Sequence, residues 1–119
     1  MRTLLIVLAT LTCSSALADE PVKIVVEVSA GVDAGKKLVI HAGDAFQVGR
    51  SPESDLQLAN DARVSRQHLK VSCDARRCQM EDLGSTNGTT LNGKPVKTAE
   101  VKPGDRLKLG DTQLVVRRP

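Results

Sequence analysis

Aromatic side chains are almost absent from this chain of 119 residues, which contains Phe46 but no Trp or Tyr. A hydrophobic core must therefore consist of Val, Leu and Ile, a composition that favours strands. Single-stranded nucleic acids are bound by stacking bases on aromatic side chains. The net charge of +3 is modest, with acids and bases interspersed, which is typical of a solvated surface rather than a DNA-binding stripe. We therefore expect one domain with no nucleic-acid partner.

Long hydrophobic runs are also missing. The apolar run at residues 4–9 follows Arg2, and the segment closes on the A-x-A pattern of residues 16–18. These features predict a secretory signal peptide over residues 1–18, cleaved to leave a domain of residues 19–119. We expect an exported protein, periplasmic or secreted, with no stable membrane span after cleavage.

Two alternatives to a cleaved signal peptide remain open. A membrane anchor would need about 20 consecutive apolar residues, and the run is shorter. A lipoprotein signal at Cys13 would need small residues directly before that cysteine, where the sequence has residues 10–12, Thr-Leu-Thr.

Two cysteines remain after signal cleavage, Cys73 and Cys78, and an even number in an exported protein suggests a disulfide. They flank the polar tetrapeptide 74–77, a hairpin pattern. At a non-hydrogen-bonded pair the facing Cα atoms lie about 4.5 Å apart, within the range that a disulfide spans, from about 4.4 Å. Two reduced thiols or half a zinc site are the alternatives. Only His41 and His68 could complete a zinc site, so we expect no metal.

Short β-branched or alternating apolar runs follow the signal, with Gly and Asn turns between them and no sustained helical periodicity. This pattern predicts an all-β fold, an antiparallel β-sandwich of many short strands. Asn92-Gly93 and Gly110-Asp111 are strong signals for tight hairpin turns. The expected strands are residues 22–28, 38–40, 46–48, 56–58, 69–73, 78–83, 90–91, 106–109 and 113–116.

Three polar clusters interrupt these runs, at residues 49–51 (Gly-Arg-Ser), 65–68 (Ser-Arg-Gln-His) and 84–88 (Gly-Ser-Thr-Asn-Gly). They supply hydroxyl groups, further hydrogen-bond donors and two arginines. Such a set suits a doubly charged oxyanion, because charge-assisted and bidentate Arg contacts to phosphate are strong. They contain no nucleophile–base pair or metal set, so we expect no enzyme and no cofactor.

The order Gly-Arg, Ser-Arg-Gln-His and Leu-Gly-Ser-Thr-Asn-Gly-Thr resembles a forkhead-associated (FHA) domain, a module that reads phosphothreonine. The resemblance covers roughly residues 22–117. It implies that the three clusters converge at one end of the sandwich and bind a phosphothreonine-containing segment of a protein partner.

The resemblance also implies a role for each site residue. Arg50 contacts the phosphate, and Ser65 donates its hydroxyl to the same group. Arg66 flanks the phosphate, Thr86 shapes the slot for the threonine methyl group, and Asn87 holds the peptide backbone. These roles are chemically consistent, because phosphothreonine carries about −1.5 to −2 charges and three acceptor oxygens.

Four further residues are expected to be structural. Gly49, Gly84 and Gly88 permit tight turns and positive φ angles. A single histidine that follows a polar residue and precedes a strand is more often a buried hydrogen-bonding group than a base. We therefore assign His68 a scaffold role, which the resemblance also implies.

Export leaves an alternative function open, because ATP-dependent kinases are not expected outside the cytoplasm. The domain either reads a protein phosphorylated before export or acts as a phosphate-independent interaction or scaffold domain. In a purely structural interpretation, Arg50 forms a surface salt bridge with Glu53 or Asp55.

Overall fold

The computed structural model describes residues 22–119, and the predicted signal peptide over residues 1–18 lies outside this range. Every regular element in the described part is a strand. The strands are β1 (Val22–Ala30), β2 (Lys37–His41), β3 (Ala45–Gly49), β4 (Leu56–Gln57), β5 (Leu69–Cys73), β6 (Cys78–Asp82), β7 (Thr89–Leu91), β8 (Lys94–Val96), β9 (Thr98–Val101), β10 (Arg106–Leu109) and β11 (Thr112–Arg117). Within residues 22–119, no helix is long and apolar enough to cross a membrane.

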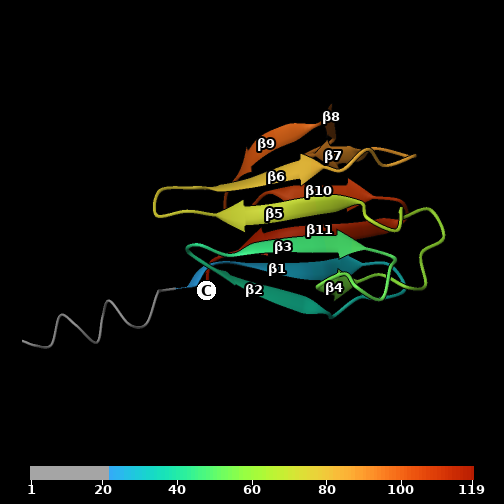
Figure 1. Cartoon of the computed structure of the whole chain (residues 1–119), viewed down its shortest axis with the longest axis horizontal. Coiled ribbons are helices and arrows are strands. Elements are labelled where there is room, and N and C mark those ends of the chain that lie inside the picture. The colour runs from blue at the N-terminus through green and yellow to red at the C-terminus, as the bar shows by residue number, and fades with distance from the viewer. Residues whose placement is uncertain (1–21) are drawn as a thin grey trace, which may run out of the picture.

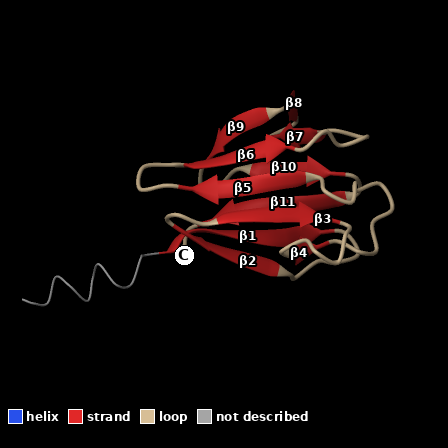
Figure 2. Ribbon diagram, in the orientation of Figure 1, coloured by secondary structure: helices blue, strands red, loops and turns tan. Residues whose placement is uncertain are grey.

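The strands form two sheets that pack face to face (Figures 1 and 2). The six-stranded sheet has the order β2-β1-β11-β10-β7-β8, and the five-stranded sheet has the order β4-β3-β5-β6-β9. All pairings are antiparallel except β3 with β4, which is parallel. The predicted all-β sandwich is therefore confirmed, with one parallel pair added.

The core between the sheets is aliphatic, as the lack of aromatics requires. β5 and β6 show the expected alternation, with every second side chain buried. Phe46 is only partly buried and packs against the core. The buried apolar side chains are Ile24, Val26, Val28, Ile40, Val48, Leu56, Leu58, Val64, Leu69, Val71, Cys73, Cys78, Met80, Val101, Leu107, Leu109, Leu114 and Val116.

Both predicted tight turns are present. Asn92 and Gly93 join β7 to β8 with positive φ angles of 51° and 86°. Two consecutive positive φ angles are what a type I′ hairpin turn requires. Gly110 and Asp111 likewise join β10 to β11, and the φ angle of Gly110 is 59°.

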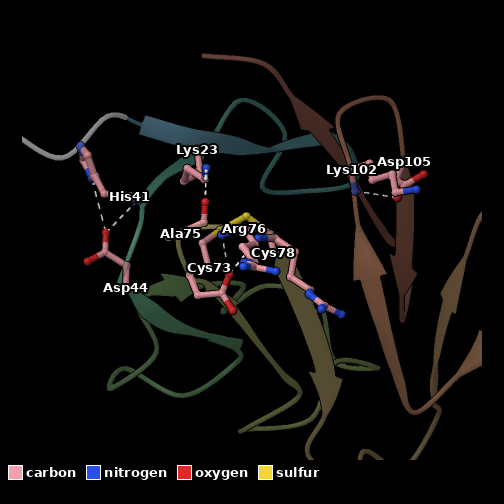
Figure 3. The surroundings of a disulfide bond; sticks show 11 residues. Lys23, His41, Asp44, Cys73, Ala75, Arg76, Cys78, Lys102 and Asp105 are labelled. Atoms are coloured by element: carbon pink, nitrogen blue, oxygen red, sulfur yellow. Dashed lines mark hydrogen bonds and ion pairs between the residues drawn. A yellow bond between two sulfur atoms is a disulfide. The ribbon is translucent and has the colours of Figure 1, made fainter.

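The predicted disulfide joins Cys73 at the end of β5 to Cys78 at the start of β6 (Figure 3). Their Cα atoms are 4.0 Å apart. The Asp74 N–H donates to the Arg77 carbonyl at 2.8 Å, which places the cysteines at the adjacent non-hydrogen-bonded pair. The Asp74 carboxylate also accepts the N–H groups of Arg76 and Arg77. The disulfide is therefore a local cross-link within one ordered hairpin.

Two strands, β8 and β9, were not among the strands expected from the sequence. β9 pairs with β6 over four residues, with Cys78 opposite Val101 and Glu81 opposite Thr98. β9 therefore forms one edge of the five-stranded sheet, and the chain reaches it directly from β8 of the other sheet.

Candidate functional site

Three connections gather at one end of the sandwich: β3–β4, β4–β5 and β6–β7 (Figure 1). Each carries one of the polar clusters. The β5–β6 hairpin, the start of β1 and the C-terminus lie at the opposite end. Because both β3 and β6 run toward the same end, residues distant in sequence meet there.

Backbone hydrogen bonds join the first cluster to the second. The Arg50 N–H donates to the Ser65 carbonyl at 3.0 Å, and the Ser51 N–H donates to the Arg66 carbonyl at 3.1 Å. The expectation of a positive φ angle at Gly49 is wrong, because that glycine is absent from the positive-φ set. Glycine is needed there for space instead, since a Cβ would lie 2.2 Å from the Arg66 oxygen.

Arg50 is half-buried and is held by the second cluster. Its Nε donates to the Val64 carbonyl at 3.0 Å, so the four other N–H donors of the guanidinium group remain for a ligand. Among residues 22–119, no ion pair involves Arg50. Glu53 accepts the Ser51 hydroxyl, and Asp55 accepts a backbone N–H of β3. The proposed surface salt bridge of Arg50 is therefore not formed.

Ser65 joins the second cluster to the third. Its Oγ accepts the Thr86 N–H at 3.0 Å, which leaves its own O–H to donate elsewhere. The Ser65 N–H donates to Nδ1 of His68 at 3.0 Å. The backbone N–H of Ser65 and one acceptor site of its hydroxyl are thus occupied by the scaffold, and the O–H donor remains.

His68 is completely buried and connects the same two loops. Nδ1 accepts the Ser65 N–H, and Nε2 donates to the Gly88 carbonyl at 3.0 Å. This pairing requires the neutral imidazole. Burial lowers the pKa of His68, although the Gly88 carbonyl and the nearby Asp82 carboxylate partly oppose the shift. His68 is thus buried and hydrogen-bonded, as expected, and its scaffold role stays a prediction.

Asp82 organises the third cluster and was missed in the sequence. Its carboxylate accepts the N–H of Gly84 at 2.9 Å, the N–H and hydroxyl of Ser85 at 2.8 and 2.6 Å, and the Thr89 hydroxyl at 2.8 Å. Burial would raise the pKa of Asp82, but these hydrogen bonds lower it to about 2. An aspartate directly before a turn of small polar residues is the signal that could have revealed it.

Asp61 plays a similar part in the β4–β5 loop and was also missed. Its carboxylate accepts the N–H groups of Arg63 and Asp111 at 3.0 and 2.9 Å and the Thr112 hydroxyl at 2.6 Å. Burial would raise the pKa of Asp61, and these hydrogen bonds lower it. The loop that carries Ser65 is thereby anchored on the β10–β11 turn.

Asn87 links the third cluster directly to the β4–β5 loop. Its Nδ2 donates to the Arg63 carbonyl at 2.8 Å, so one N–H and the amide oxygen remain available. Gly84 and Gly88 flank this part of the loop with φ angles of 81° and 78°. The positive φ angles predicted for these two glycines are confirmed.

These loops enclose an open, mostly polar cleft of about 460 Å³. All five residues predicted to bind the phosphopeptide line it. Three arginines and no carboxylate belong to its lining, so the cleft is suited to an anion. The lining residues are Arg50, Ala62, Arg63, Val64, Ser65, Arg66, Gly84, Thr86 and Asn87. Arg63 is the lining arginine that the sequence did not single out.

The described residues thus form an aliphatic β-sandwich with a cationic cleft between three end loops. The chain belongs to the FHA domain family, and the family match spans residues 46–110. The family resemblance seen in the sequence is therefore confirmed.

Among similar proteins, the glycogen accumulation regulator GarA of Mycolicibacterium smegmatis is 35% identical over 88 residues, which cover 74% of this chain and 54% of GarA. FhaA of Mycobacterium tuberculosis is 34% identical over 96 residues, covering 75% of this chain and 18% of FhaA. The chain thus spans less than two thirds of these relatives.

A solved structure from a structural and functional analysis of phosphothreonine-dependent FHA domain interactions superposes with a TM-score of 0.72. It is 31% identical, and the alignment covers 81% of this chain and 96% of that one. The likeness therefore extends beyond the motifs to the arrangement of the strands.

Proposed function

We propose that this chain is a protein-interaction domain that binds a phosphothreonine-containing segment of a partner protein in the cleft between the three loops. The observation that carries the proposal is the composition of the cleft: three arginines, a serine hydroxyl with a donor to spare, and no carboxylate. FHA domains are interaction modules. We accordingly propose that the chain binds its partner without catalysing a reaction.

In this proposal Arg50 and Ser65 hold the phosphate. Arg50 is preorganised by its contact to the Val64 carbonyl, so little side-chain entropy is lost when it binds. Ser65 supplies its O–H, and the exposed guanidinium group of Arg66 neutralises the remaining charge. Charge-assisted hydrogen bonds of this kind are about twice as strong as neutral ones.

The other two residues recognise the peptide around the phosphate. Asn87 keeps one N–H and its amide oxygen, which match the N–H and C=O groups of an extended backbone. Thr86 lines the cleft beside Ser65 and forms the slot for the threonine methyl group. One buried methyl group is worth about 0.8 kcal/mol, so we expect threonine to be preferred over serine only modestly.

We also propose that the protein is exported and acts in the periplasm or outside the cell. The features of residues 1–18 support this location, and a disulfide suits an oxidising compartment. The partner is then a protein phosphorylated before or during its own export. A phosphate-independent scaffold of the cell envelope is the competing function.

A phosphopeptide-library screen followed by variants of Arg50 tests the proposal. Arg50→Ala removes a charge-assisted contact that only the phosphorylated peptide makes, and such truncations cost about 2–5 kcal/mol when the partner charge is desolvated. We expect its affinity for the selected phosphopeptide to fall more than tenfold. Arg76→Ala, which removes an exposed arginine at the opposite end, is the matched control and should bind like the parent.

The scaffold alternative predicts a different result. Partner binding would then survive phosphatase treatment, and Arg50→Ala would be indistinguishable from Arg76→Ala. That outcome would remove the phosphothreonine proposal and leave the fold untouched.

A further inference from the structure

Two asparagines of the chain precede a glycine: Asn87-Gly88 in the third polar cluster and Asn92-Gly93 in the β7–β8 turn. The side-chain amide of such an asparagine is chemically labile, because the next backbone nitrogen can attack its Cγ and glycine has no Cβ to hinder the approach. Both asparagines are exposed. Their hydrogen bonds in the folded chain differ, and this difference decides which of the two can react.

Asn92 is held by three hydrogen bonds. Its Nδ2 donates to the Asp105 carboxylate at 3.0 Å, and its Oδ1 accepts the Arg106 N–H at 2.9 Å. Its own N–H donates to the Arg106 carbonyl at 2.8 Å. The type I′ turn also fixes its φ angle at 51° between two paired strands. The side chain of Asn92 must therefore leave both of its partners before the Gly93 nitrogen can attack it.

Asn87 is held much more loosely. Its side chain makes one hydrogen bond, from Nδ2 to the Arg63 carbonyl at 2.8 Å. Within residues 22–119, no hydrogen bond involves the backbone N–H or carbonyl of Asn87. A Cβ placed on the neighbouring Gly88 would meet nothing within 4 Å, so this part of the loop has room to move. The Asn87 backbone is therefore free to rotate and bring Cγ to the Gly88 nitrogen.

The Gly88 nitrogen also has a path for its proton. Its N–H donates to Oγ of Ser85 at 3.0 Å, and the Ser85 hydroxyl donates in turn to the Asp82 carboxylate at 2.6 Å. Hydrogen bonds in such a chain polarise one another. The carboxylate thus makes Ser85 a better acceptor, and Ser85 makes the Gly88 nitrogen a better nucleophile.

We propose that Asn87 is a site of spontaneous deamidation, and that the product weakens binding in the cationic cleft. The Gly88 nitrogen attacks Cγ of Asn87 and forms a C–N bond, and the side-chain nitrogen leaves as ammonia with the proton of the Gly88 N–H. Water then opens the resulting succinimide ring to aspartate or isoaspartate. The effect on binding rests on the function proposed above, whereas the deamidation itself does not.

Either product changes the cleft in two ways. The Nδ2 donor is lost, and with it the hydrogen bond that links the β6–β7 loop to the Arg63 carbonyl. A carboxylate also enters a cleft whose lining has three arginines and no acid. Like charges brought together strongly oppose association. We therefore expect the affinity for a phosphopeptide to fall irreversibly as the protein ages.

Isotope labelling of the full chain tests the modification site. The folded chain is kept in heavy-oxygen water at mildly alkaline pH, and mass spectrometry assigns the incorporated label to Asn87 or Asn92. We expect Asn87 to react about tenfold faster or more, because two further hydrogen bonds must break at Asn92. In the chain unfolded by urea, both should react at similar rates. Equal or faster labelling of Asn92 in the folded chain would overturn the site.

Asn87→Asp, which reproduces one product, tests the effect on binding. We expect it to bind the selected phosphopeptide about tenfold more weakly than the parent, or worse. Gln79→Glu makes the same change of amide to carboxylate at an exposed position of β6 beside the disulfide, and it should bind like the parent. Equal affinity of the two variants would overturn the effect. A parent that binds no phosphopeptide would instead refute the proposed function, while the labelling result would still decide the modification site.

Discussion

At the scale of single residues, the site separates buried acids from accessible cations. Asp61 and Asp82 are buried and accept several hydrogen bonds each, so their charges hold loops rather than ligands. Arg66 is exposed and Arg50 is half-buried, and within residues 22–119 neither has an acidic partner within ion-pair distance. The acids therefore fix the shape of the cleft, and the arginines give it its charge.

Asp82 gives the folded protein a defined sensitivity to acid. The pKa of its carboxyl group falls from an ordinary 3.8 to about 2 on folding, since hydrogen bonds from Ser85, Thr89 and Gly84 outweigh burial. A group whose pKa is lower in the folded state stabilises the fold fully above pH 4 and loses this effect as the pH falls toward 2. The shift corresponds to about 2 kcal/mol.

Asp82→Asn should therefore unfold at lower urea concentration than the parent at pH 7, and the two curves should approach each other between pH 4 and pH 2. Glu100→Gln, at an exposed position of β9, is the control and should follow the parent throughout. A constant difference between Asp82→Asn and the parent across this pH range would show that the charge of Asp82 does not stabilise the fold.

At the scale of elements, the sequence predicts what local chemistry determines. The turns at Asn92-Gly93 and Gly110-Asp111, the β5–β6 hairpin and its disulfide were all foreseen, because each is specified within a few residues. β9 was not, since Ala99 and Glu100 have little strand preference and pair only because β6 lies alongside. The parallel contact of β3 with β4 was not foreseen either.

The candidate site shows the same division. The sequence indicated five residues predicted to bind a phosphopeptide through three local motifs, and the structure brings all five to one cleft. The sequence did not indicate that the Arg66 carbonyl leaves room only for glycine at position 49. It also did not indicate that Asp61 reaches the β10–β11 turn. These contacts span 17 or more residues. Hydrogen bonds between distant loops leave no pattern in a single sequence.

The disulfide should contribute modestly to stability. The disulfide between Cys73 and Cys78 restricts only a short loop of the unfolded chain. This restriction stabilises the folded state by about 2 kcal/mol. The Cys73→Ser, Cys78→Ser double variant should still fold, with a lower melting temperature, and should keep its affinity for a phosphopeptide because the cleft lies at the other end. Failure of this variant to fold would show that the disulfide is essential.

At the scale of the whole molecule, the two ends of the sandwich carry different features. The loops that line the cleft lie at one end. The start of β1, the C-terminus and the disulfide hairpin lie at the other end (Figures 1 and 3).

Export with processing is the prediction that belongs to this scale. Intact-mass analysis of the protein isolated from the cell envelope or the medium should give a chain that begins at Asp19. A protein that keeps Met1 and remains in the cytoplasm would contradict the proposed location. The phosphothreonine proposal would stand in that case, because a domain in the cytoplasm does not require a partner that was phosphorylated before export.

The central claim is that the cleft binds phosphothreonine, and a calorimetric titration with one partner peptide in two forms tests it most directly. The peptide is synthesised with threonine and with phosphothreonine at the same position, and each form is titrated into the parent protein. We predict that the phosphorylated form binds well over tenfold more tightly, because in the proposed complex Arg50 and Ser65 contact only the phosphate. Equal affinity for the two forms would contradict the claim.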